Sequence, residues 1–220
     1  MTYSELEKLL FSIADEKFAS FSKSLSNSDY ISIGVKNPVL RQIIKEHKND
    51  SDLKTEDFKL GKYLEIDFIY FGLSLSRLTT SKEQLDFLLR NAKNAKSWAI
   101  TDCLSSFMKS VKFEDYENFF IKSYKSNDTY LRRMGYVLGL KLYKDERIVN
   151  IVPLIQLYEE YIVMMAEAWL LSVIALKQEG RVYTFLQNCP DLTLKRKTIS
   201  KINDSFRFSE ETKNKFKLLR

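Results

Sequence analysis

Two residues near the middle of the chain, Trp98 and Asp102, pair an aromatic ring with an acid at a spacing that could carry chemistry. They lie in the segment KSWAITD, where a separation of four residues places them on one face of a helix. A carboxylate can stabilise a developing positive charge and orient water, and a tryptophan face also favours cations. The alternative is a core tryptophan and a carboxylate paired with a neighbouring base. A second tryptophan, Trp169 in AEAWLLS, fits plain core packing when viewed alone.

Basic residues that could contact phosphates lie in two segments, YLRRMG and LKRKTISK. They are Arg132, Arg133, Lys195, Arg196, Lys197 and Lys201. The first pair stands near a helix start, where the helix dipole disfavours cations, so the pair either has another role or is an ordinary solvated pair. The second cluster fits phosphate contact and surface solubility equally well.

The charge of the chain is concentrated at its end. Residues 177–220 carry the whole formal net charge of +6. Such asymmetry is a candidate footprint for a polyanion such as nucleic acid. The alternative is a solvated, lysine-rich pair of terminal helices.

The elements that position these residues are predicted to be helices. The 220 residues include only 6 Gly and 3 Pro, too few for the turns of a sheet protein or for a glycine-rich phosphate loop. No segment shows sustained apolar and polar alternation, so we predict no strand. The predicted fold class is all-α.

Local signals predict where helices begin and end. Three starts are predicted, at Ser4 with Glu7 and Ser81 with Gln84 as capping boxes, and at Asn37 before Pro38. Helical spacing of apolar residues also predicts a helix through Ile151, Leu154, Ile155 and Tyr158. The serine-rich stretch from Phe21 to Asp29, FSKSLSNSD, is predicted to be a loop.

The helices recur along the whole chain. Units of about 12 to 16 residues, paired as hairpins, give repeats near 40 residues, the period of HEAT-like units. About a dozen short helices favour a curved solenoid of antiparallel pairs with a concave basic face, although a compact bundle shows similar spacing. No linker divides the sequence, so we predict a single domain over residues 1–220.

Composition also bounds the cofactors and the compartment. One His and two Cys cannot form a zinc site of the usual kind, and we expect no metal, no cofactor and two free cysteines. The start MTYSELEKLL does not read as a signal peptide, and no uncharged apolar run approaches 18 residues. We therefore expect a soluble, cytoplasmic monomer with no membrane partner.

Five segments in order resemble the bacterial HEAT-like-repeat DNA glycosylases of the AlkD type, known as DNA alkylation repair proteins. They are SIGVKNPVLRQIIK, KSWAITD, YLRRMGYVL, AEAWLLSVI and LKRKTISKI, and they span Ile33 to about Lys201. In the first segment Gly34, Val35, Pro38 and Arg41 fill the early signature of that family.

The resemblance implies a function. Members of that family hold duplex DNA on a basic concave surface and hydrolyse the N-glycosidic bond of cationic N3- and N7-alkylpurines without extruding the base. By resemblance Asp102 is the catalytic carboxylate, Trp98 and Trp169 are aromatic walls, and Arg133 contacts a phosphate. These four residues are then expected to converge on the concave side.

One part of the chain departs from the family pattern. Active members carry a longer segment before the Gly-Val signature, which forms a small basic and aromatic helix that faces DNA. Only Ala19 to Tyr30 stand there in this chain, so we expect that helix to be missing, duplex DNA binding to be weak, and excision to be weak or absent. An active glycosylase that uses Asp102, and a non-enzymatic repeat protein with another partner, both remain open.

Overall fold

The computed structural model describes residues 1–26, 28–108, 110–155 and 160–220. Within these ranges the regular structure is α-helical with short 3-10 helices, beside one isolated bridge between Ile31 and Tyr63. The predicted all-α class is confirmed. The chain forms two compact units, Met1–Ser110 and Val111–Arg220, and we describe each by itself. The single domain and the solenoid with a concave face therefore stay predictions.

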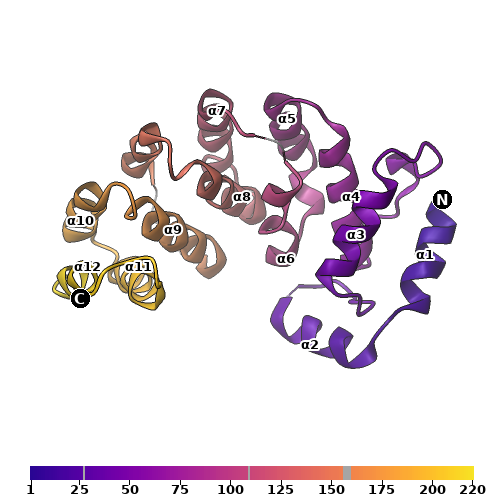
Figure 1. Ribbon diagram of the computed structural model, residues 1–220, viewed down its shortest axis with the longest axis horizontal. Helices are drawn as coiled ribbons and strands as arrows, with labels where there is room; N and C mark the ends of the chain where they lie inside the picture. The colour runs from indigo at the N-terminus through magenta and orange to yellow at the C-terminus, as the bar shows by residue number, and fades with distance from the viewer. Residues whose placement is uncertain (27, 109, 156–159) are drawn as a thin grey trace. The chain divides into compact units, whose positions relative to one another are not determined.

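The first unit is built around helices α3 and α4, which pack on each other. Figure 1 draws its helices in indigo to magenta. Its α-helices are α1 (Tyr3–Ser12), α2 (Glu16–Ser26), α3 (Asn37–His47), α4 (Leu64–Arg77), α5 (Ser81–Asn91) and α6 (Trp98–Thr101), and its 3-10 helices are η1 (Thr55–Asp57), η2 (Ala92–Asn94) and η3 (Leu104–Ser106). Both Leu6 of α1 and Ile69 of α4 are fully buried in the shared core.

The capping boxes stand slightly earlier than the sequence predicted. Thr2 with Glu5 caps α1, and Thr80 with Glu83 caps α5. Glu83 accepts hydrogen bonds from the backbone and side chain of Thr80, and a carboxylate suits the positive end of the helix dipole better than the neutral Gln84. Helix α3 begins at Asn37 itself, one residue earlier than predicted, with Lys36 in the cap position.

The buried carboxylate of Glu65, in the first turn of α4, organises the loop that leads into α3. Its Oε1 accepts hydrogen bonds from the backbone N–H of Gly34 (2.9 Å) and Val35 (3.3 Å) and from the Ser32 hydroxyl (2.8 Å). Its Oε2 accepts from the N–H of Ile33 (2.9 Å). A buried charge is tolerated when such donors surround it. The loop therefore wraps around an anion that is part of the protein.

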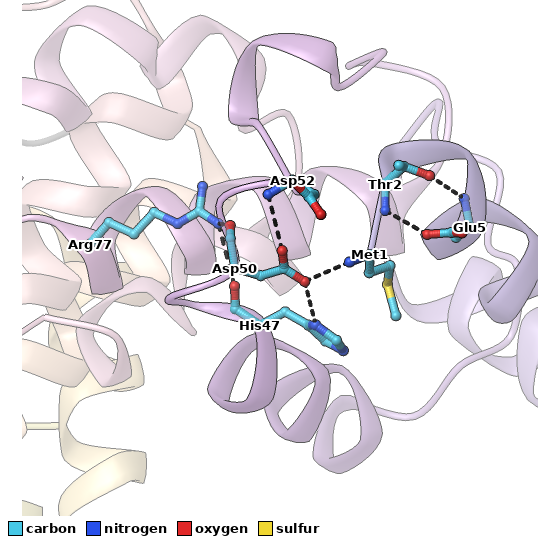
Figure 2. Close-up of polar contacts among 7 residues, drawn as sticks. All are labelled: Met1, Thr2, Glu5, His47, Asp50, Asp52 and Arg77. Atoms are coloured by element: carbon cyan, nitrogen blue, oxygen red, sulfur yellow. Dashed lines mark hydrogen bonds and ion pairs between the residues drawn. The ribbon is translucent and has the colours of Figure 1, made fainter.

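Figure 2 shows a second polar cluster, at the end of α3. The Asp50 carboxylate lies 2.7 Å from the α-amino nitrogen of Met1 and 3.2 Å from Nδ1 of His47. Hydrogen bonds from the Met1 amino group and from the Asp52 N–H hold the pKa of Asp50 well below its usual range. Arg77, the last residue of α4, donates to the carbonyls of Lys48 (2.8 Å) and Asp50 (2.9 Å). The cluster thus fastens α1 and α4 to the carboxyl end of α3.

A helix occupies much of the stretch between α1 and the Gly34 loop, where a loop was predicted from Phe21 to Asp29. That prediction is wrong over residues 21–26, because α2 forms there, and Asp15 caps it by accepting from the N–H of Phe18 (3.0 Å). The absence of the basic DNA-facing helix of the family stays a prediction. Among its serines this stretch also contains an apolar stripe at helical spacing, formed by Phe18, Phe21 and Leu25. Asp15 also donates its N–H to the Gly34 carbonyl (3.2 Å), which joins α2 to the loop around Glu65.

The second unit consists of layered helices. Figure 1 shows α9 beside both α8 and α11, and the contacts agree. Its α-helices are α7 (Phe113–Tyr124), α8 (Thr129–Gly139), α9 (Tyr161–Ile174), α10 (Glu179–Asn188), α11 (Leu192–Asp204) and α12 (Glu210–Lys217), and its 3-10 helices are η4 (Leu140–Leu142) and η5 (Glu146–Leu154). The helix predicted through Ile151 is of the 3-10 type and contains Pro153, which has no N–H to donate. Ile155 lies beyond its end, and Tyr158 lies outside the described residues.

Replacing Glu65 with glutamine tests the loop. The amide NH₂ of glutamine faces backbone donors that now bind a carboxylate oxygen, so we expect Glu65→Gln to lower the free energy of unfolding by about 2 to 3 kcal/mol. Urea denaturation followed by circular dichroism measures the change. The matched control is Glu56→Gln, an exposed carboxylate of η1, for which the change should stay within about 0.5 kcal/mol. Equal losses in the two variants would show that the hydrogen bonds of Glu65 do not stabilise the loop.

Two glycines with positive φ, Gly34 and Gly61, allow the cost of backbone strain to be compared with the cost of steric crowding. Gly34 has φ +99° and Gly61 has φ +89°. A Cβ at Gly34 would lie 2.2 Å from the Asp15 carbonyl oxygen, whereas the described residues leave the space beside Gly61 open. We expect Gly61→Ala to cost about 1 kcal/mol from strain alone and Gly34→Ala to cost at least about twice as much. Melting temperatures of the two variants compare these costs, and equal values would contradict the predicted crowding.

Candidate active site and nucleic-acid surface

Trp98 and Asp102 lie at the two ends of one short helical turn. Helix α6 is shorter than the sequence suggested, because it spans Trp98–Thr101 with Ser97 as N-cap and Asp102 as C-cap. The N–H of Asp102 donates to the Trp98 carbonyl (3.0 Å), and its Oδ1 accepts from the Thr101 hydroxyl (3.3 Å). The predicted spacing of one turn therefore holds.

Both residues line one cavity of about 170 Å³ in the first unit. The apolar stripe of α2, formed by Phe18, Phe21 and Leu25, lines the same cavity. Phe21 keeps 56% of its surface exposed. The remaining lining residues are Ser22, Val35, Asn37, Leu40, Leu64, Glu65, Phe68, Ala99 and Cys103. The candidate carboxylate thus stands at a largely apolar, partly open hollow, where charge interactions are stronger than in bulk water.

The indole of Trp98 fastens α2 to this site. Its Nε1–H donates to the carbonyl of Leu25, in the last turn of α2 (3.1 Å). Carbonyls at a helix end lack partners within the helix, so this hydrogen bond satisfies one of them. Helix α2 was not predicted to belong to the site, although the i, i+3, i+7 spacing of its apolar stripe is typical of an amphipathic helix.

Arg132 and Arg133 are 7% exposed in the second unit. The Arg132 guanidinium donates to the Ser126 carbonyl (2.7 Å) and forms an ion pair with Glu160. Arg133 donates to the carbonyl of Ile162, in the first turn of α9. These contacts connect the start of α8 to the start of α9, which accounts for two cations near a helix start. Little of either side chain is left to touch a phosphate.

Trp169 and the basic residues of α11 form an aromatic and basic surface on the second unit. Lys201 Nζ lies 5.7 Å from the centroid of the Trp169 ring, and Lys197 Nζ lies 5.6 Å from that of Tyr161. Trp169 is 37% exposed and lines a hollow of about 310 Å³ with Lys201 and Arg207. It is therefore a surface residue, unlike the core tryptophan that its segment suggested when viewed alone.

The other two cations of α11 stand on the same helix. Arg196 is exposed and Lys195 is half-buried. The structure thus brings Trp98 together with Asp102 in the first unit, and Trp169 together with Lys201 in the second. The convergence of Trp98, Asp102, Arg133 and Trp169 on one concave surface stays a prediction.

A carboxyl group that was not predicted from the sequence, that of Glu167 in α9, has a strongly shifted pKa. It is fully buried, and burial raises its pKa to about 8, with Tyr136 acting in the opposite direction. The negative charges of Asp191 and Glu160 raise the pKa further. Glu167 is thus mostly protonated at neutral pH.

The raised pKa of Glu167 predicts that the free energy of unfolding depends on pH. Because its folded pKa lies above the value of an unfolded glutamate, its contribution is full at low pH and is lost as the pH rises toward 8. We expect wild type to lose stability relative to Glu167→Gln between pH 5 and 8, by up to about 1.4 kcal/mol per pH unit. Urea denaturation of both proteins at several pH values measures the difference. A difference that does not vary with pH would contradict the raised pKa.

The described residues gather no group of three or more potential metal ligands. In the same ranges no helix is both long and apolar enough to cross a membrane. The described side chains around Asp102 are mostly aromatic or aliphatic, with Glu65 as a second carboxyl, whereas those around Trp169 include the cations Lys201 and Arg207 beside Asp204. This chemistry suits a phosphate-rich partner with a positively charged centre.

Comparisons with known proteins agree with a DNA-repair fold. The family model described as "DNA alkylation repair enzyme" matches residues 6–203. A solved structure, a predicted DNA alkylation repair enzyme from Enterococcus faecalis, is similar with a TM-score of 0.70 and 14% identity, over 87% of this chain and 98% of that chain. At this identity the likeness shows the fold alone. No curated protein matches the sequence. The chain belongs to the DNA alkylation repair enzyme family.

Proposed function

We propose that the chain binds duplex DNA as a monomer and hydrolyses the N-glycosidic bond of cationic N3- or N7-alkylpurines. Asp102 is the catalytic carboxylate in this proposal, and Trp98 and Trp169 are the aromatic walls. One observation carries it: Asp102 and Trp98 line the same hollow beside the apolar stripe of α2. Helix α2 supports the proposal, because its apolar stripe forms one side of this hollow.

The chemistry needs no metal, cofactor or general acid. An N-alkylated purine is already cationic, so the C1′–N bond breaks with its electron pair going to the base, which leaves neutral. The sugar becomes an oxocarbenium-like cation, and water adds to C1′ with loss of a proton. A carboxylate at Asp102 can stabilise that cation and orient the water, while an aromatic face adds attraction for positive charge.

Binding in this proposal is weak and depends mainly on phosphate contacts. The cations of α11 supply these contacts, and Arg132 and Arg133 contribute mainly long-range charge because they are nearly buried. Beside Trp169 the side chain of Ser172 is neutral and donates to the Trp169 carbonyl (2.7 Å). Fewer neutralised phosphates mean lower affinity and a smaller salt dependence than in a fully basic relative.

A second candidate is a non-enzymatic member of the family that binds DNA without excision. The Trp98 hydrogen bond favours it, because this contact gives the indole a structural role in holding α2. The buried arginines favour it as well. Excision measurements separate the two candidates.

Duplex DNA that contains N7-methylguanine tests the proposal. We expect base release faster than the spontaneous loss in a protein-free control, and we expect Asp102→Asn to slow it about a hundredfold or to the control level. Single-turnover release with excess protein is the measurement. The matched control is Asp57→Asn, an exposed carboxylate of η1 in the same unit, which should retain the wild-type rate.

Circular dichroism of Asp102→Asn checks that the fold is unchanged. Wild-type release no faster than the control, combined with measurable duplex binding, would favour the non-enzymatic candidate. Release that Asp102→Asn leaves unchanged would remove this residue from the chemistry.

A further inference from the structure

A polar groove of about 610 Å³ crosses the second unit at the carboxyl ends of η4 and α9. Four cationic side chains line it, from Lys144, Arg147, Lys177 and Arg181, against one carboxylate, Glu146. The Gln178 side chain donates to the Glu146 backbone carbonyl (2.6 Å) and so joins the two sides of the groove. The lining is thus fixed to the fold and carries more cationic than anionic side chains.

The charge of the groove is not compensated from within the described part of the chain. Arg147 is neutralised locally, because it pairs with Asp145 (2.7 Å) and with Glu114. Lys144, Lys177 and Arg181 are exposed, and the described residues provide no ion pair to any of them. Three accessible cations around an open, polar trough attract a polyanion more than a compact apolar ligand.

Contacts with the Tyr143 ring connect the groove to the surface around Trp169. Arg207 lines the hollow beside Trp169, and its guanidinium lies 4.9 Å from the centroid of the Tyr143 ring. Lys144 Nζ approaches the same ring, at 5.9 Å. In addition, Leu176 lines that hollow and its neighbour Lys177 lines the groove. Positive charge therefore runs from Lys201 through Arg207 and Lys144 to the groove.

We infer that the groove binds the phosphate backbone of duplex DNA beyond the lesion, as an extension of the Trp169 surface. This inference rests on the proposed function, because it uses duplex DNA as the partner. Lys144, Lys177 and Arg181 neutralise backbone phosphates and read no bases, so the groove raises affinity without regard to sequence. It compensates in part for the two arginines that the fold has buried between α8 and α9.

The test is the double variant Lys177→Ala/Arg181→Ala on an alkylated duplex of about 30 base pairs, long enough to extend past one site. We expect its affinity at low salt to fall about tenfold, and the slope of log affinity against log salt to decrease by about 2. Hydroxyl-radical footprinting should lose protection on one flank and keep it around the lesion. Single-turnover excision at saturating protein should keep the wild-type rate.

The matched control is Lys112→Ala/Lys122→Ala, which removes two exposed cations before and within α7. Equal affinities and slopes for the two double variants would overturn the groove while leaving the proposed function intact. A lower excision rate at saturation would also overturn it, because the groove would then act in positioning rather than in affinity. Wild-type protein that binds no duplex at low salt would remove the proposed function and the groove together.

Discussion

The first unit depends on the buried carboxyl group of Glu65. Four donors from Ser32 to Val35 surround it, and the loop that they form sets the start of α3. The same loop receives α2 through the contact between Asp15 and Gly34. Since Glu65 also lines the cavity beside Asp102, the loop and the candidate site share one wall. A buried carboxyl group held by four hydrogen bonds is rigid, and this rigidity fixes the loop to which α2 is joined.

The second unit uses buried cations in a comparable way. Arg132 and Arg133 join α8 to α9 by binding backbone carbonyls and Glu160. A guanidinium suits this role because its planar donors can reach several acceptors at once. Two basic residues that were predicted to contact DNA therefore also hold two helices together, and their role toward DNA stays a prediction. The charge available to a polyanion lies on α11 and along the groove at Lys177.

Aromatic rings and cations alternate over the accessible part of the second unit. Lys197 approaches Tyr161, Lys201 approaches Trp169, and Arg207 approaches Tyr143. In each pair the charged group lies within 6 Å of the ring centroid, where the ring attracts positive charge. Such pairs keep lysines extended along the surface, and this arrangement suits contact with a row of phosphates.

The sequence by itself determined the all-α class, the positions of most helices and the one-turn spacing of Trp98 and Asp102. These features follow from local rules, since capping, periodicity and scarce glycine act over a few residues. Only the tertiary structure decided that Arg132 and Arg133 are buried and that Trp169 is at the surface. Only it revealed that the serine-rich segment before Gly34 forms α2 over the cavity. Burial of a side chain depends on which helix faces pack against each other across distant segments. The order of charged residues along the chain does not determine that packing.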